Sequence, residues 1–185
     1  MKKLLTIIIT TLIASGSVNA QEYEYDARFG WFPGDLMDLI YRMGEDPVEQ
    51  TTYGPRKTIG IFAADFNYSI MKWLSVGARL NYRNAWCETK SFTDEGVPVT
   101  GIDRLHAVSV IPMVTGTTDQ DSVFRYYVSL GIGAGIDMST AENNRYLAFQ
   151  LIPVGIAVGK KVSWYFECGL GNAYAGFMTG VSWRF

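Results

Sequence analysis

The sequence predicts an all-β fold, an eight-stranded antiparallel up-and-down transmembrane β-barrel, and two observations lead to this prediction. Hydrophobic residues make up 48% of the 185 residues, yet the mean hydropathy is only +0.06, so apolar residues must be interleaved with polar ones. From residue 23 to the end of the chain, apolar and polar residues alternate with period two. This is the pattern of strands with two different faces.

Residues 1–20 have the pattern of a secretory signal peptide. Two lysines precede a short apolar stretch, and small residues lead to Ala20. A membrane-spanning helix needs about 20 apolar residues, which is longer than this stretch. We therefore expect export, cleavage before Gln21, and a single barrel domain over residues 21–185.

Five segments alternate clearly and three more are less regular, which gives eight expected strands. The clear segments are 23–31, 74–82, 124–137, 162–170 and 177–185. The less regular segments are 58–68, 105–114 and 146–158. Pro112 and Pro153 each lack a backbone donor, so we expect a bulge near each of them. The sequence leaves open which face of those two strands points inward.

The connections between these segments alternate in length. Short polar links are expected at 69–72, 116–122 and 159–161. Longer connections are expected at 32–57, 88–104 and 139–145, and a tight turn at 171–172 closes the last hairpin. This asymmetry is typical of an outer-membrane barrel, with turns in the periplasm and loops outside the cell. Residues 34–43 have helical spacing with Asp35 as N-cap, so a short helix is expected in the 33–57 loop, whose role stays open.

The charge-bearing face of the strands also carries glycine, whereas the other face is bulky and almost free of charge. The glycines are Gly30, Gly77, Gly131, Gly133, Gly135, Gly169 and Gly180. Aromatic residues lie near segment ends at Trp31, Tyr82, Trp164, Trp183 and Phe185. The inside of an eight-stranded barrel needs small residues, and a lipid-facing wall carries aromatic girdles, so the charged face is predicted to point inward. The alternative, a secreted soluble barrel or sandwich, exchanges the two faces.

The chain stops on a strand at an aromatic residue. Its alternating positions Phe177, Val181, Trp183 and Phe185 look like the C-terminal signal recognised by the barrel assembly machinery, with Thr179 as a mild departure. Together with the signal peptide and the alternation, the whole mature chain resembles the small eight-stranded OmpA/OmpX-like outer-membrane β-barrel family.

This resemblance implies an integral protein of the outer membrane of a Gram-negative bacterium. Its expected partners are membrane lipid and lipopolysaccharide, the assembly machinery during biogenesis, and a protein bound at the extracellular loops. The implied role is structural or interactive, without a cofactor. Related small barrels are variously plugs, narrow pores and adhesive scaffolds, so the resemblance leaves the interior open.

Ten charged residues are predicted to point inward. The cations are Arg28, Arg79, Arg83, Arg125 and Arg184. The anions are Glu24, Asp26, Asp65, Asp137 and Glu167. Eight strands enclose a space that side chains can fill, so we expect these charges to pair in a network that plugs the barrel. A narrow porin-like channel for small solutes is the alternative.

A lipid A-modifying enzyme is the third and least favoured hypothesis. A hydrolase needs its nucleophile and base on one face, within hydrogen-bond reach. The lone histidine, His106, lies three positions from Ser109, so alternation puts the two side chains on opposite faces. We therefore expect no catalytic residues and place His106 at the rim or in an aromatic girdle.

The remaining chemistry-bearing residues give little support for a metal, cofactor or nucleic-acid site. The chain has one histidine, two separated cysteines and a formal net charge of −2. Alternation points Cys87 inward and Cys168 outward on opposite walls, so no disulfide is expected.

Overall fold

The structure is a computed structural model that describes residues 24–33, 52–53, 57–92, 98–118, 122–139 and 143–185. The expected signal peptide and the expected helix at 34–43 lie outside these residues. The regular structure of the described residues is all β. None of the described segments contains a helix that could span a membrane.

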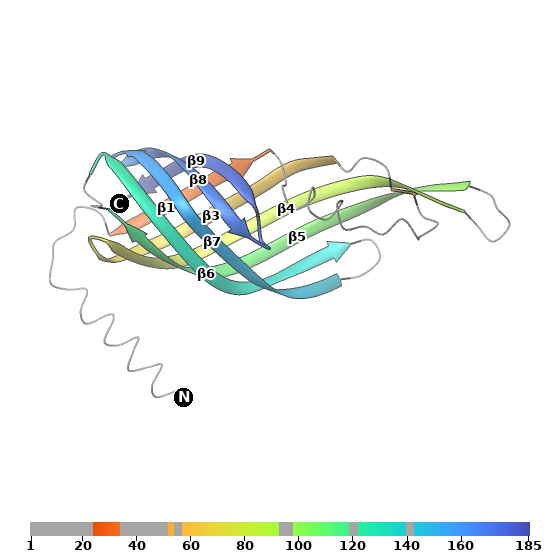
Figure 1. Cartoon of the computed structure of the whole chain (residues 1–185), viewed down its shortest axis with the longest axis horizontal. Coiled ribbons are helices and arrows are strands. Elements are labelled where there is room, and N and C mark those ends of the chain that lie inside the picture. Colours follow the sequence, from red (N-terminus) through yellow and green to blue (C-terminus); the bar gives the residue numbers. More distant parts are fainter. Residues whose placement is uncertain (1–23, 34–51, 54–56, 93–97, 119–121, 140–142) are drawn as a thin grey trace, which may run out of the picture.

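Eight antiparallel strands close into a barrel, which confirms the predicted fold (Figure 1). The ring consists, in order, of β1 (Tyr25–Phe32), β3 (Lys57–Met71), β4 (Leu74–Phe92), β5 (Pro98–Thr117), β6 (Phe124–Ser139), β7 (Asn143–Gly159), β8 (Val162–Gly171) and β9 (Gly176–Arg184). Pairing of β1 with β9 closes it. A short extra strand, β2 (Thr52–Tyr53), lies outside the ring and pairs with β4.

The two ends of the barrel differ. At one end, here called the turn end, lie the connections between β3 and β4, β5 and β6, and β7 and β8, together with Tyr25 and Phe185. Gly159, with φ of 130°, allows the tight connection from β7 to β8. The opposite end, here called the loop end, holds the other connections. The predicted asymmetry in connection length is confirmed only for the first connection, between β1 and β3. The other loop-end connections, 93–97, 140–142 and 172–175, are shorter than 118–123 at the turn end.

The predicted loop 88–104 is wrong, because strands occupy most of it. β4 continues to Phe92, β5 begins at Pro98, and the two stay in register throughout. This hairpin projects beyond the rest of the barrel at the loop end (Figure 1). Backbone pairing holds it together, and such pairing does not require the apolar alternation from which strands were predicted.

Only one of the two expected bulges is present in the described strands. The β7–β8 register shifts between Leu151 and Val154, next to Pro153. At Pro112 there is no bulge: Pro112 pairs in register with Ala78 of β4, and the β5–β6 register is the same on both sides of this residue. Pro112 lacks the backbone N–H that would donate one hydrogen bond to a neighbouring strand. Losing that hydrogen bond does not insert an extra residue into β5, so no bulge results.

The inward and outward faces match the prediction. Arg79 and Glu167 are 1% and 0% exposed, whereas Leu130 and Trp164 are 56% and 63% exposed. Four tyrosines lie inside over glycines, as Tyr127 over Gly155, Tyr146 over Gly135, Tyr165 over Gly30 and Tyr174 over Gly169. A Cβ atom at any of these glycines would overlap the tyrosine side chain, so the glycines provide the room that the crowded interior requires.

Candidate functional site

The centre of the barrel is an ion-pair cluster around Arg79. Its guanidinium donates to both carboxylate oxygens of Asp65 on the neighbouring strand β3, at 2.5 and 2.6 Å. It also donates to both oxygens of Glu167 on β8, at 2.7 and 3.2 Å. Three strands separate β4 from β8 in either direction around the ring. Arg79 therefore bridges opposite walls of the barrel.

Glu167 is fully buried and has two further donors. The Tyr127 hydroxyl donates to Oε2 at 2.9 Å and the Tyr174 hydroxyl donates to Oε1 at 2.8 Å. A buried carboxylate is tolerated when a cation and hydrogen bonds replace the lost water. Glu167 has both, so the cluster is a satisfied polar plug.

A second contact crosses the barrel closer to the turn end. Arg28 on β1 pairs with Asp26 at 2.7 Å, and its guanidinium carbon lies 4.4 Å from the ring centre of Tyr127. Strands β1 and β6 are also opposite in the ring. The Tyr127 hydroxyl thus contacts Glu167 of the Arg79 cluster, and the Tyr127 ring contacts Arg28. The position of Arg28 over the ring agrees with cation–π geometry.

The other predicted interior charges are distributed along the lumen. The Arg83 guanidinium nitrogen Nη2 lies 3.8 Å from Oδ1 of Asp137. Arg125 donates to the Ser163 hydroxyl at 2.7 Å, and Arg184 donates to the carbonyls of Lys160 and Gly159 at 2.6 and 3.2 Å.

Glu24 is the exception among the ten residues. It is exposed and precedes β1, so the prediction that it belongs to the interior network is wrong. The Glu24 carbonyl still accepts a hydrogen bond from the Ser69 N–H at 2.8 Å, but Glu24 lies at the very end of the barrel, where its side chain is open to solvent. The described interior therefore holds five cations and four anions instead of five of each.

Sequence reasoning missed the role of Tyr174. The connection from β8 to β9 turns into the lumen, and Ala173, Tyr174 and Ala175 are all buried. Gln150 fixes this connection, because its amide donates to the Tyr174 carbonyl at 3.1 Å and accepts from the Tyr174 N–H at 3.2 Å. Alternation along a strand cannot predict that a connection between strands folds into the lumen, so it gives no indication of Tyr174. Tyr127 lies within an alternating strand, and the alternation predicts its inward position.

The predicted assembly-signal residues lie on the outer face of the last strand or directly after it. Phe177, Val181, Trp183 and Phe185 are all exposed. Phe185 exchanges two backbone hydrogen bonds with Tyr25, at 2.9 and 3.0 Å, and the two rings stack at 5.6 Å. The C-terminal residue thus contributes to the closure between β1 and β9.

His106 and Ser109 point to opposite faces, as predicted. Ser109 is buried inside, whereas His106 lies on the outer side with its Nδ1 2.9 Å from the Tyr82 hydroxyl and 3.0 Å from the Asn84 amide nitrogen. Cys87 points inward on β4 and Cys168 lies on the outward face of β8, and neither is in a disulfide.

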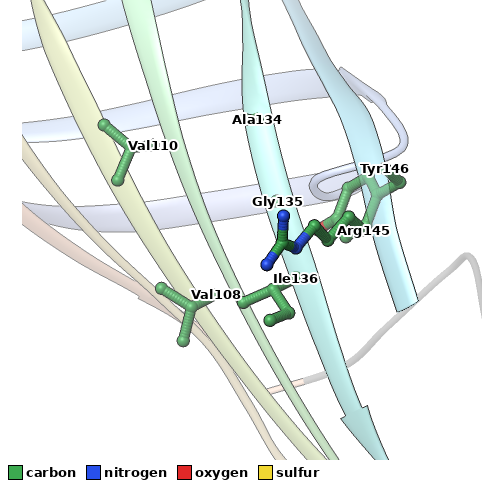
Figure 2. A pocket seen from close by; sticks show the side chains of 7 residues that line it. All are labelled: Val108, Val110, Ala134, Gly135, Ile136, Arg145 and Tyr146. Atoms are coloured by element: carbon green, nitrogen blue, oxygen red, sulfur yellow. The ribbon is translucent and has the colours of Figure 1, made fainter. Parts of the chain in front are cut away.

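A depression of about 420 Å³ lies on the wall of the barrel over β5, β6 and β7 (Figure 2). Its lining residues are Val108, Val110, Ala134, Gly135, Ile136, Arg145 and Tyr146. It contains no carboxylate, histidine or nucleophilic serine. Among the residues that the structure describes, no cluster of three or more His, Cys, Asp or Glu could hold a metal ion.

Comparison of the chain with protein-family models and with curated proteins found no match. The resemblance to OmpA/OmpX-like barrels therefore stays a prediction from the sequence.

Proposed function

We propose that the mature chain is a non-enzymatic integral barrel of the Gram-negative outer membrane. Its interior is plugged, and its loop end faces outside the cell and binds a partner. The observation that carries the proposal is the outer wall: the surface that a soluble protein would make polar is apolar and uncharged over a continuous band.

This band runs around the whole ring. No outward-pointing residue is charged in segments 25–31, 62–68, 74–82, 108–116, 124–138, 147–158, 162–170 and 177–185. Charged residues flank it at both ends, with Lys72, Lys160 and Lys161 in the turns and Glu88, Arg104 and Arg145 toward the loop end. A nine-residue segment tilted by about 40° rises about 20 Å, close to the height of the apolar band of outer-membrane barrels.

The plugged interior favours a structural or interaction role over transport. Arg79, Glu167 and Tyr174 fill the middle of the lumen with mutually satisfied polar groups. An eight-stranded barrel has room for side chains but little more. The narrow channel is therefore the alternative, and it requires this cluster to open.

The projecting β4–β5 hairpin is the surface that we propose for partner binding. Strand β6 ends opposite Leu105, so no described strand pairs with residues 98–104 on that side of β5. Val99 and Ile102 on this segment are exposed. An unpaired strand edge with exposed apolar side chains can add a strand from another protein.

A charge in the middle of the band is expected to impair membrane insertion. Leu130→Arg should destabilise the inserted barrel by about 2–4 kcal/mol, because it places a guanidinium against lipid. Ile102→Arg is the matched control, since Leu130 and Ile102 are 56% and 57% exposed but only Leu130 lies in the band. Urea unfolding in phospholipid vesicles, followed by the heat-dependent shift in gel mobility, measures both. A chain that is soluble and folded without detergent, or equal effects of the two substitutions, would contradict the proposal.

The wild-type barrel is expected to give no stable conductance in planar bilayers, because the Arg79–Glu167 contact closes the lumen. Single-channel recording of the refolded protein measures this. Reproducible openings that change in Arg79→Ala would instead identify the protein as a narrow channel.

A further inference from the structure

The depression on the outer wall over β5, β6 and β7 (Figure 2) has a small side chain at its centre. Ala134 points outward on β6, and every other outward residue of this strand, from Phe124 to Met138, is larger. Ala134 pairs with Val110 on one side and with Leu147 on the other. Leu147 is 71% exposed, the highest value among the large hydrophobic residues that the structure describes. The depression of about 420 Å³ is therefore apolar, and its volume lies within the range of roughly 300–1,000 Å³ that is typical of ligand sites.

One of the residues that line this depression is charged, and it is a cation. Arg145 on β7 pairs with Ile136, two positions closer to the loop end than Ala134. Figure 2 shows the Arg145 side chain extending from β7 toward β6. It is exposed, and within the described part of the chain no residue forms an ion pair or hydrogen bond with it. No outward position of β6, β7 or residues 104–117 of β5 carries a carboxylate. An anion at this guanidinium must therefore come from a ligand.

The position of Arg145 in the wall indicates the chemistry of that ligand. From Leu147 to Val158 the outward residues of β7 are apolar, so Arg145 lies at the loop-end limit of the apolar band. In a membrane barrel this level meets the lipid headgroups, and the depression lies at the level of the adjoining acyl chains. Guanidinium groups bind phosphate with paired, charge-assisted hydrogen bonds. A ligand that fits both parts has a phosphate and a hydrocarbon chain in one molecule.

We propose that the depression holds one acyl chain of a lipopolysaccharide molecule, and that Arg145 binds a phosphate group of the same molecule. The inference rests on the proposed function, which places the loop end outside the cell and therefore this level in the outer leaflet. Phospholipid would be the occupant in the opposite orientation.

The test is native mass spectrometry of the mature chain, refolded in neutral detergent micelles and titrated with lipid A. The wild-type barrel should bind bisphosphorylated lipid A about tenfold more tightly than dephosphorylated lipid A, because the second form lacks the charge-assisted hydrogen bonds to Arg145. Arg145→Met should remove this preference. Arg104→Met is the matched control, since Arg104 is also an exposed arginine toward the loop end but does not line the depression. An unchanged preference in Arg145→Met, or an equal loss in Arg104→Met, would overturn the proposal.

A second pair of variants tests the acyl chain. Ala134→Phe fills the depression with an apolar ring and should weaken binding of both forms of lipid A by about fivefold, because the acyl chain loses apolar contact area. Ala78→Phe makes the same change at another exposed, outward alanine, on β4 and away from the depression, and should leave the affinity unchanged. Equal effects of the two substitutions would show that the depression does not hold the chain.

Phosphatidylglycerol distinguishes the two sources of phosphate and acyl chain. It carries one phosphate and two acyl chains, and it should bind more weakly than bisphosphorylated lipid A. Equal affinity for the two lipids would overturn lipopolysaccharide as the occupant. The heat-dependent shift in gel mobility of each variant, measured before lipid is added, keeps the two proposals apart. A chain that is folded and soluble without detergent contradicts the proposed function and this inference together, whereas a folded barrel without a preference for phosphorylated lipid A contradicts this inference alone.

Discussion

Replacing Arg79 by methionine is expected to lower the free energy of unfolding by about 3–5 kcal/mol, the range for removing one partner of a buried ion pair. Methionine fills similar space but leaves Asp65 and Glu167 buried with no cation between them. Urea unfolding of the refolded barrel in vesicles measures the loss.

Two further variants distinguish charge from packing. The triple variant Arg79→Met, Asp65→Asn, Glu167→Gln removes both carboxylate charges along with the cation and should recover most of the loss. Arg104→Met removes an exposed arginine on the projecting hairpin and should change stability by less than about 0.5 kcal/mol. A loss below about 1 kcal/mol in Arg79→Met would show that the cluster does not hold the walls together.

Deleting Phe185 is expected to prevent most of the protein from reaching the outer membrane as a folded barrel. The deletion removes the aromatic end of the predicted assembly signal and two backbone hydrogen bonds to Tyr25. In vesicles without assembly machinery the loss should be only about 2 kcal/mol, from two hydrogen bonds at about 1 kcal/mol each. Heat-modifiable protein in isolated outer membranes, compared with refolding in vesicles, measures the two effects.

The variant Phe185→Ala distinguishes the role of the aromatic ring in the predicted assembly signal from the role of the backbone hydrogen bonds that close the barrel between β1 and β9. It keeps both backbone hydrogen bonds but removes the ring that stacks on Tyr25. If this variant also fails to accumulate in the membrane but refolds in vesicles, the ring is the recognised feature. Normal accumulation of the deletion variant would contradict the assignment of an assembly signal.

The sequence by itself determined the features that depend on neighbouring positions along a strand. Period-two alternation gave the eight strands of the barrel, the inward positions of residues such as Arg79 and Glu167, and the opposite faces of His106 and Ser109. It succeeded because successive side chains in a strand point to opposite faces, whatever the strand pairs with. It failed for the β4–β5 hairpin, whose backbone pairing continues where the alternation fades.

Only the tertiary structure decided which charges meet. Arg79 and Glu167 are 88 positions apart and come together because β4 and β8 are opposite in the closed ring. Closure also left Glu24 outside and brought Tyr174 into the lumen on an inward-folded connection. Register and closure involve partners far apart in the chain, so local periodicity gives the face on which a charge lies but not the residue that it contacts.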